Sequence, residues 1–214
     1  MTVNNLGEKN SIADQFLSEL RDIHHQNDRH RFRYNLSRLG EIMAYEISRN
    51  LPFQRREVET PLGKKSMLVP NTKVILITIL RAGLPFLEGF QRVYDQADTG
   101  FIGSYRVEGN SDIHINTDYL AAPALTGNTV ILVDTMLATG RSITDAIATL
   151  MRRGQPHYLH IASVIAAPEG VRHLQENVTL PASLWTFSID ERLNAKSYIV
   201  PGLGDAGDLS FGPK

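Results

Sequence analysis

VILVDTMLATGRS, residues 130–142, is the stretch from which the fold is most readily predicted. Its apolar first part predicts a buried strand that ends at Asp134, and after a short loop with Thr139 and Gly140 a helix is expected to start at Ser142. When a strand is followed by a tight loop and then by the start of a helix, backbone N–H groups and the positive end of the helix point at one place. This arrangement favours binding of a phosphate monoester. The Walker pattern G-x-x-x-x-G-K-[ST] occurs nowhere in the chain, so this is a different kind of phosphate loop.

Asp134 stands at the carboxyl end of the predicted strand. Its carboxylate suits the hydroxyls of a sugar attached to the phosphate, and the alternative is an aspartate that caps a turn or a helix. Ser142 and Asp145 fit a capping box for the helix, and Gly154 with Pro156 marks the helix end. The local sequence leaves both roles of Asp134 open.

Strands and helices are expected to alternate in the part of the chain that contains this stretch. Because strands that alternate with helices favour a parallel sheet covered on both faces, we expect an α/β fold with a mostly parallel sheet. The expected strands are 73–80, 100–106, 128–133, 158–167, 183–189 and 197–201, and the expected helices are 142–153, one from residue 85 onward and one from residue 168 onward.

The N-terminal part, from about residue 11 to residue 50, is expected to be helical. Apolar residues recur there at spacings of three and four, as on one face of a helix: Phe32, Leu36, Leu39, Met43 and Ile47. The arginines beside this stripe, which we interpret as a solvated face or a subunit contact, are Arg29, Arg31, Arg33 and Arg38. A single domain, 1–214, is expected, with this helical segment and an α/β core of about 70–214.

Composition excludes several kinds of protein. The 214 residues carry a formal net charge of -1 and no cysteine, so disulfides and cysteine-ligated zinc are excluded, and no nucleic-acid partner is called for. The longest apolar run, 74–80, is too short to cross a bilayer, and the N-terminus lacks the layout of a secretion signal. A cytoplasmic protein without membrane contact is expected.

The C-terminal stretch PGLGDAGDLSFG, 201–212, contains Gly202, Gly204 and Gly207 in the spacing of a dinucleotide-binding turn. That motif needs a following helix, a second strand and an acidic residue about 20 positions on. Only DLSFGPK follows, in which we expect neither helix nor strand. The glycines are therefore predicted to form a tight loop whose backbone groups approach a small flat ligand.

Residues 107–128 are polar, contain Gly and Asn, and are expected to form a projecting arm or flap. No Lys or Arg occurs between Val107 and Gly140. Asp112 and His114 could suggest a metal site, but alternation along a hairpin arm explains them better. No direct protein-held metal is expected.

Five segments in order resemble one known family. Residues 133–142 are similar to the phosphoribosyl pyrophosphate (PRPP) loop of type I phosphoribosyltransferases, in the variant found in uracil phosphoribosyltransferases. The other segments that resemble this family, at similar spacing, are ILRAGLPF (79–86), SYR (104–106), AAPEG (166–170) and SIDERLNAKSYIVPGLGDAGDLSFG (188–212).

The resemblance implies the type I fold with a flap and a C-terminal hood over the base, and the reaction of uracil with PRPP to give uridine 5′-monophosphate (UMP) and pyrophosphate. It implies Mg²⁺ as cofactor, held mainly by PRPP and through water by Asp205, a homodimer or larger homo-oligomer, and leaves open regulation by GTP. The residues it assigns to PRPP are Arg81, Arg106, Asp134, Thr135, Met136, Leu137, Ala138, Thr139, Gly140, Arg141, Ser142 and Asp205. Those it assigns to uracil are Ile199, Gly204, Asp205 and Ala206, and Arg81, Arg106 and Asp205 are the expected catalytic residues.

The chain departs from the family pattern at two positions of the loop. Thr135 stands where the family usually has Pro, and Arg141 where it usually has Gly. If the backbone at Arg141 needs a positive φ, a side chain there costs about 1 kcal/mol. If not, the guanidinium either contacts a phosphate or faces solvent.

Three alternatives to uracil transfer remain at this point. The first is a phosphoribosyltransferase for another nucleobase. The second is an RNA-binding regulator of pyrimidine genes with the same fold, against which the near-neutral charge argues. The third is an inactive homologue, which the retained Arg81, Asp134, Thr139 and Asp205 argue against.

Overall fold

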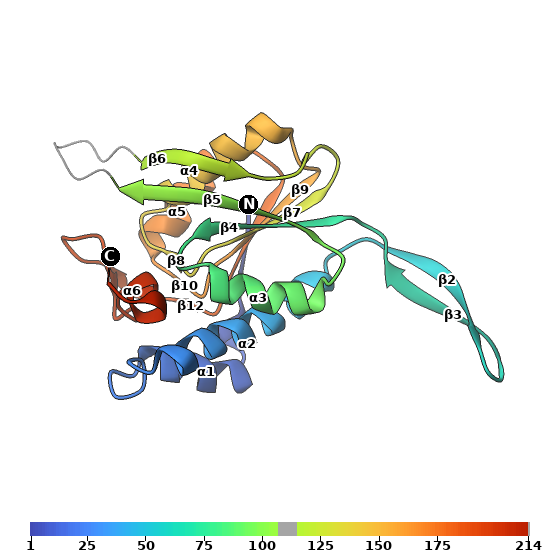
Figure 1. The fold of residues 1–214 in the computed structure, drawn as a ribbon, viewed down its shortest axis with the longest axis horizontal. Helices are drawn as coiled ribbons and strands as arrows, with labels where there is room; N and C mark the ends of the chain where they lie inside the picture. The colour runs from blue at the N-terminus through green and yellow to red at the C-terminus, as the bar shows by residue number, and fades with distance from the viewer. Residues whose placement is uncertain (107–114, 214) are drawn as a thin grey trace.

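A seven-stranded sheet is the centre of the computed structural model, which describes residues 1–106 and 115–213, apart from the side chains of 104–106 and 115–118 (Figure 1). The strand order is β1-β11-β9-β7-β4-β5-β6, and every neighbouring pair is parallel except β5 with β6. The strands are β1 (Thr2–Asn5), β4 (Val74–Leu80), β5 (Asp98–Arg106), β6 (Ile115–Ala121), β7 (Thr129–Val133), β9 (Tyr158–Ala162) and β11 (Ala182–Thr186). The expected α/β fold with a mostly parallel sheet is confirmed.

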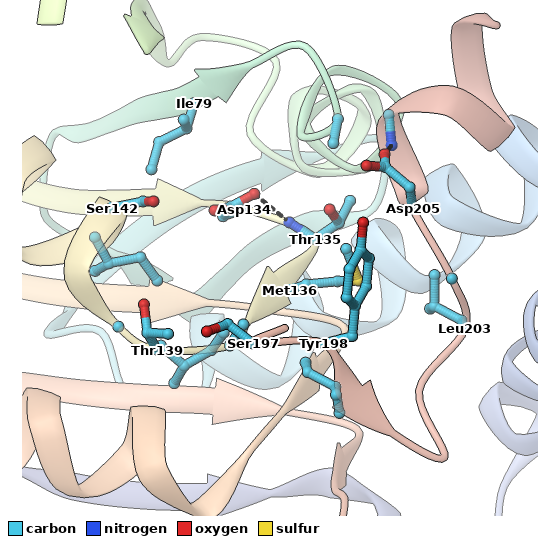
Figure 2. Close-up of a pocket in the computed structure, with 18 of the residues that line it drawn as sticks. Ile79, Asp134, Thr135, Met136, Thr139, Ser142, Ser197, Tyr198, Leu203 and Asp205 are labelled. Atoms are coloured by element: carbon cyan, nitrogen blue, oxygen red, sulfur yellow. Dashed lines mark hydrogen bonds between the residues drawn. The ribbon is translucent and has the colours of Figure 1, made fainter. Parts of the chain in front are cut away.

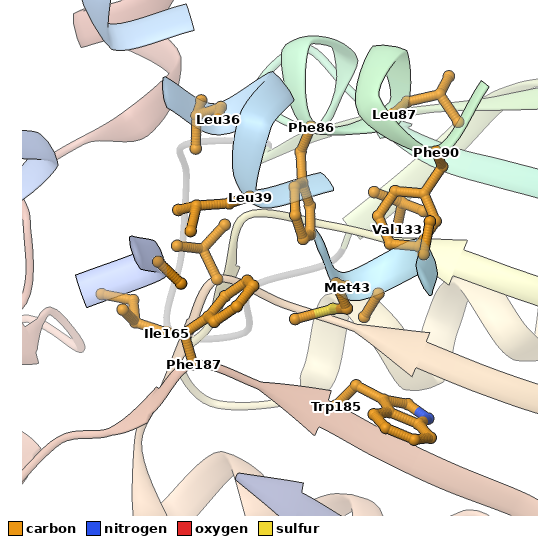
Figure 3. Packing of buried hydrophobic residues seen from close by; sticks show 14 of the residues in the cluster. Leu36, Leu39, Met43, Phe86, Leu87, Phe90, Val133, Ile165, Trp185 and Phe187 are labelled. Carbon is orange, nitrogen blue, oxygen red and sulfur yellow. The ribbon is translucent and has the colours of Figure 1, made fainter. Parts of the chain in front are cut away.

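Helices cover both faces of this sheet, and the apolar runs of the central strands are buried on both sides. Along β4, Leu76 packs in one core cluster, whereas Ile75 and Ile77 pack in the other, because successive side chains of a strand point to opposite faces. The helices α1 (Ile12–Arg21), α2 (Arg29–Ser48) and α3 (Leu84–Val93) belong to the first cluster, and α4 (Arg141–Leu150) and α5 (Pro168–Asn177) belong to the second. Figure 3 shows side chains of α2 and α3 packed against Val133 and Ile165.

Two glycines allow α2 and α3 to cross closely. A Cβ atom added at Gly89 would lie 2.0 Å from the Ser37 carbonyl oxygen, and one added at Gly40 would lie 2.2 Å from that of Phe86. The contact brings Phe86 and Phe90 of α3 into the core, with their rings edge to face at 5.2 Å. This packing positions the start of α3, and with it the segment from Leu80 to Gly83.

Three strands are interrupted at the carboxyl edge of the main sheet and continue in a second, parallel sheet. Its order is β12-β10-β8, and each of its strands follows β11, β9 and β7 respectively. The bounds are β8 (Met136–Leu137), β10 (Ile165–Ala166) and β12 (Ser188–Ile189). The expected single strands 158–167 and 183–189 are therefore each two strands. A separate antiparallel pair is formed by β13 (Arg192–Leu193) and β14 (Ile199–Val200).

The structure corrects other expectations at helix ends. The segment 11–50 is two helices, because a turn over residues 22–28 separates α1 from α2, and Asp28 caps α2 by accepting from the Arg31 amide. The capping box of Ser142 with Asp145 is wrong, since α4 already begins at Arg141 and its N-cap is Gly140. A short helix, α6 (Ala206–Phe211), follows the glycine-rich loop where no helix was expected.

The arm that projects in Figure 1 is the hairpin of β2 (Phe53–Thr60) and β3 (Gly63–Pro70), which was not predicted. The expected flap at 107–128 is different in its described part: β6 is an edge strand of the main sheet, paired antiparallel with β5. Residues 107–114, with Asp112 and His114, lie outside the described residues.

Arginines of α2 connect elements of the same chain. Arg31 donates to both oxygens of Glu19 in α1, and Arg33 donates to the Ser210 carbonyl at 2.7 Å. Arg38 lies over an aromatic ring with its guanidinium carbon 4.0 Å from the centroid. The interpretation as a solvated face or subunit contact is therefore wrong for Arg33, which holds the C-terminal segment. Within the described residues, no helix is both long and apolar enough to cross a membrane.

Candidate functional site

A pocket of about 290 Å³ opens at the carboxyl ends of β4 and β7 (Figure 2). Three segments form its walls: the end of β4, the loop from β7 to α4, and a C-terminal segment that begins before β14 and ends in α6. The lining residues are Ile79, Leu80, Arg81, Ala82, Asp134, Thr135, Met136, Leu137, Ala138, Thr139, Gly140, Ser142, Ile143, Lys196, Ser197, Tyr198, Ile199, Leu203, Gly204, Asp205 and Gly207.

The start of α4 is the anion-binding feature of this pocket. Gly140, the N-cap, has φ +81°, and no side chain caps the helix. A Cβ atom on Gly140 would lie 2.9 Å from the His173 ring and 3.1 Å from the Gly170 carbonyl oxygen, so glycine is required for both conformation and space. The first-turn residues Ser142 and Ile143 line the pocket, where helix N-termini stabilise negative charge.

Asp134 follows β7 directly and lines the same pocket. Burial raises the pKa of this carboxyl group to about 7, and the Thr135 N–H, which donates to Asp134 Oδ1 at 2.7 Å, lowers it in part. Thr135 is 1% exposed, and its carbonyl oxygen accepts from Val164. A proline at 135 could not donate the hydrogen bond to Asp134, so the departure from the family pattern gives this carboxylate one additional donor.

Arg141 carries no backbone strain. The positive φ falls on Gly140, while Arg141 is the first residue of α4, and Ser197 is the one described non-glycine residue with positive φ. Arg141 is exposed and does not line the pocket. Of the two expected alternatives, a phosphate contact or a guanidinium that faces solvent, this position favours the second. The rest of the predicted loop, 134–140 and Ser142, lines the pocket.

Arg81 follows the end of β4 and brings a cation to the opposite wall. Its Nη2 lies 3.4 Å from Asp208 Oδ1 and 3.5 Å from the Gly212 carbonyl oxygen, and its side chain is 39% exposed. These long contacts orient the guanidinium and leave donors free for a ligand. Arg106 ends β5, beside β4, and Leu80 of β4 pairs with Gly103 of β5. Its backbone thus extends beyond the end of β4, and its side chain lies outside the described residues.

The C-terminal segment forms the third wall. Before β14 it contributes Ser197 and Tyr198, and after it Leu203 to Asp205. Asp205 Oδ1 accepts from the amides of Gly207 and Asp208 at 2.8 and 3.0 Å, which starts α6. Figure 2 shows Tyr198 and Asp205 as sticks at the pocket with Asp134.

One of the four predicted uracil residues, Ala206, is placed differently from the others. Ile199 and Gly204 line the pocket, but the methyl group of Ala206 is fully buried in the core cluster and does not line it. The whole residue is 0% exposed, so the predicted contact of Ala206 with uracil stays a prediction.

Comparisons with known proteins agree with this geometry. A family model described as uracil phosphoribosyltransferase matches residues 8–213. The chain is 46% identical over 217 residues to a uracil phosphoribosyltransferase of Porphyromonas gingivalis, with 100% of each chain covered. It is 37% identical over 208 residues to that of Thermococcus gammatolerans, with 96% of this chain and 91% of the relative covered.

The chain belongs to the uracil phosphoribosyltransferase family. Among solved structures it resembles the AQ2163 protein from Aquifex aeolicus, with a TM-score of 0.86, 32% identity and coverage of 99% of this chain and 98% of that one. Uracil phosphoribosyltransferases are pentosyltransferases, so the predicted family and enzyme class are confirmed.

Sequence reasoning missed several residues that line the pocket of this family member. Lys196, Ser197 and Tyr198 belong to the segment that carries the resemblance to uracil phosphoribosyltransferases. The binding roles in this segment were assigned only to Ile199 and to residues 204–206. The position of residues 196–198 directly before Ile199 was the available signal. Ile79 and Leu203 also lie in segments that carry the resemblance, but these apolar side chains were not assigned a role.

We expect the raised pKa of Asp134 to make substrate binding pH dependent. The carboxylate accepts hydrogen bonds from sugar hydroxyls when charged, and below its pKa of about 7 it is mainly protonated. The kcat/KM for PRPP should rise as pH increases through about 7. Asp134→Asn should remove this rise and lower kcat/KM roughly 10- to 100-fold at alkaline pH. Initial rates on both sides of neutral pH measure this, and equal profiles for the two proteins would contradict it.

Stability gives an independent measurement for the same group. The folded-state pKa of Asp134 is raised above 3.8, so the native state binds more protons and the fold loses stability as pH rises from 3.8 towards 7. Urea unfolding of Asp134→Asn should show a smaller loss of stability over this window.

A second variant tests the pH profile of kcat/KM. Thr135→Pro removes the N–H that donates to Asp134, so the midpoint of this profile should move to higher pH.

Proposed function

We propose that this protein transfers the phosphoribosyl group of PRPP to uracil and releases UMP and pyrophosphate. The observation that supports this most strongly is that one pocket joins the uncapped start of α4 and Asp134 to Arg81 and to a glycine-rich backbone loop. The start of α4 suits the phosphate, Asp134 the sugar, Arg81 the pyrophosphate and the backbone loop the flat base. The names of the relatives support uracil as the base.

The 5-phosphate of PRPP would bind at the start of α4, where the amides of the first turn and the hydroxyls of Thr139 and Ser142 are donors. The ribose hydroxyls would donate to the Asp134 carboxylate. This arrangement fixes the sugar while its anomeric carbon faces the base. Holding both reactants in one geometry turns a bimolecular step into an effectively unimolecular one.

In the reaction the bond between the anomeric carbon and the pyrophosphate oxygen breaks, and its electron pair leaves with pyrophosphate. The N1 atom of uracil forms the new bond to that carbon, and the proton of N1 passes to solvent water. Negative charge therefore develops on the leaving group, and Arg81 stabilises it, together with Arg106 at the end of β5. Asp208 orients Arg81 until the ligand replaces it.

Mg²⁺ would enter the pocket as a partner of PRPP. Within the described residues, no three His, Cys, Asp or Glu side chains gather as a metal site. Asp205 lines the pocket, and its Oδ1 is occupied by two amides, so Oδ2 is the oxygen through which it could reach the ion by way of water. When bound, Mg²⁺ neutralises charge on the phosphate oxygens.

The loop 199–207 would recognise uracil by its backbone. Uracil carries two carbonyl acceptors on either side of one N–H donor, and backbone N–H, C=O and N–H groups match this order. Cytosine would place its amino group against a backbone N–H and leave a buried donor without a partner. The cost of this mismatch makes the site selective for uracil.

A homodimer or larger assembly is proposed on the basis of the β2–β3 arm. A two-stranded hairpin alone is marginally stable in water, yet nearly all of this arm is exposed. Its exposed apolar residues include Leu62, which is 100% exposed, and Leu68, which is 66% exposed. A second copy of the chain would cover these side chains. Regulation by GTP and a cytoplasmic location stay predictions.

The test of the reaction is to incubate the purified protein with PRPP, Mg²⁺ and one base at a time. We expect UMP with uracil, and turnover of cytosine, hypoxanthine and orotate at least roughly 100-fold lower, the discrimination expected when a buried donor or acceptor loses its partner. Chromatography of the nucleotides measures this. Comparable turnover of cytosine would contradict backbone recognition, and turnover of a purine alone would contradict the proposed substrate.

Arg81→Ala tests the stabilisation of pyrophosphate. We expect kcat to fall by roughly 10²–10³, the scale for loss of one preorganised charge-stabilising donor. Arg92→Ala is the matched control, since Arg92 forms an exposed ion pair with Glu41 and neither residue lines the pocket. Near-normal turnover of Arg81→Ala would refute the assignment.

The oligomer is tested by Leu62→Asp combined with Leu68→Asp on the arm. Charged side chains at these positions should dissociate the assembly, because they cannot be buried unpaired at an interface. Sedimentation velocity measures the mass. Glu57→Gln, also on the arm but in an exposed pair with Lys64, should leave the mass unchanged. A wild-type protein that sediments as a monomer would overturn the proposal.

A further inference from the structure

The base-binding loop turns sharply at Gly202. Gly202 has φ +65°, and a Cβ atom there would lie 2.3 Å from the Ile199 carbonyl oxygen. Its neighbours along the loop, Ile199 and Leu203, line the pocket, whereas Gly202 itself does not. The orientation of the Gly202 backbone therefore sets the position of lining residues on both sides of it.

Both polar backbone groups of Gly202 are bound by side chains from elsewhere in the chain. The Gly202 N–H donates to Asp190 Oδ2 at 2.9 Å, and the Gly202 carbonyl oxygen accepts from Arg21 Nη1 at 2.8 Å. Gly202 does not line the pocket, so these groups are not placed to bind a substrate. Their hydrogen bonds act on the loop and fix its conformation.

Arg21 and Asp190 are also bound to each other. Arg21 Nη1 donates to Asp190 Oδ2 at 2.7 Å and Nη2 to Oδ1 at 2.6 Å, the two parallel bonds of a guanidinium–carboxylate pair. The Asp190 side chain is 3% exposed. Burial alone would raise the pKa of Asp190, but the hydrogen bonds from Arg21, Ser188 and Gly202 outweigh it and lower this pKa. The pair is charged and largely dry.

The two partners lie on elements held by the core. Arg21 is the last residue of α1, where a cation is favourable, and Leu17 and Leu20 anchor that helix in the core. Asp190 follows β12 and accepts a further bond from the Ser188 hydroxyl at 2.7 Å. The pair thus connects the core to residues 201–205, the irregular part of the loop between β14 and α6.

We propose that Arg21 and Asp190 are positioning residues for the base, which hold the Gly202 backbone so that the loop 199–207 presents its N–H and C=O groups at the spacing that uracil requires. The inference rests on the proposed function and deepens it. A binding site made of backbone groups has no side chains to adjust, so its geometry must be fixed before the ligand arrives. The Arg21–Asp190 pair supplies this constraint from the N-terminal helices.

The contact should affect uracil more than PRPP. The pair touches the loop on the base side of the pocket, whereas the PRPP groups face α4, Asp134 and Arg81. Loss of the pair frees the loop, and uracil must then order it on binding. The KM for uracil should rise, while PRPP binding in the absence of uracil should be little changed.

The experiment measures KM for each substrate, kcat, and PRPP binding by calorimetry without uracil. Arg21→Ala should raise KM for uracil roughly 10- to 100-fold, the range for loss of charge-assisted hydrogen bonds. It should change kcat and PRPP affinity less than threefold. Arg21→Lys keeps the positive charge but lacks the two parallel N–H donors of the guanidinium. Its KM for uracil should therefore lie between those of the wild type and Arg21→Ala.

Arg31→Ala is the matched control. Arg31 donates to both oxygens of Glu19, as Arg21 does to Asp190, but this pair joins α1 to α2 and does not touch the loop. We expect an unchanged KM for uracil. If Arg21→Ala does not fold, Arg21→Lys and Ser188→Ala test the proposal in its place. Each of these variants should raise the KM for uracil and leave PRPP binding unchanged.

The outcomes separate this inference from the proposed function. A wild-type protein that makes no UMP would overturn the function. If the wild-type protein is active, an unchanged KM for uracil in Arg21→Ala and Arg21→Lys would overturn the positioning role. An equal loss of uracil and PRPP affinity would also overturn it, since a general effect on folding predicts that result.

Discussion

Hydrogen bonds across the breaks in three parallel strands support the whole site. Where β7, β9 and β11 end, the chain stops following the main sheet but remains paired: the Val164 amide donates to the Thr135 carbonyl, and the Phe187 amide donates to the Val164 carbonyl. The second sheet, β12-β10-β8, forms on these contacts. The loop before α4 thus lines the pocket while the carbonyl groups of Thr135 and Leu137 are hydrogen-bonded to the neighbouring strand segment.

The charges of the pocket follow from the same arrangement. The two carboxylates, Asp134 and Asp205, and the cation of Arg81 enter from different walls, and no two of them form a direct pair in the described contacts. Arg81 is held by Asp208 and Gly212 instead, at distances longer than those of a tight ion pair. A ligand with both hydroxyls and phosphates can therefore satisfy each group without breaking a strong internal bond.

Most of the fold could be predicted because its central strands and amphipathic helices have local signals. The run 74–80 is apolar on both faces, and the stripe from Phe32 to Ile47 has helical spacing, and both are buried as expected. The start of α4 was misplaced by one residue because a serine and an acidic residue resembled a cap, while the left-handed Gly140 forms it. The breaks in β9 and β11 had no local signal, since two-residue strands depend on partners far along the chain.

The site was predicted where a motif is continuous and missed where distant segments meet. The loop 134–142 is one such motif, and all of it except Arg141 lines the pocket. The Arg21–Asp190 pair joins residues 169 positions apart, so neither residue carried a signal of its own. The β2–β3 arm was missed because it is exposed on both faces and lacks the alternation of a half-buried strand.

The pairing of β1 with β11 has a consequence for synthesis on the ribosome. β1 is translated before its partner residues, Ser183 to Thr186. Likewise, Arg33 of α2 is translated before Ser210, whose carbonyl oxygen it binds. The N-terminal segment must therefore stay unpaired while most of the chain emerges, since non-local contacts form only after the intervening loop is closed. The base-binding wall, residues 196–207, is translated after the phosphate loop, residues 134–142, so a nascent chain has its phosphate loop before it has a site for a base.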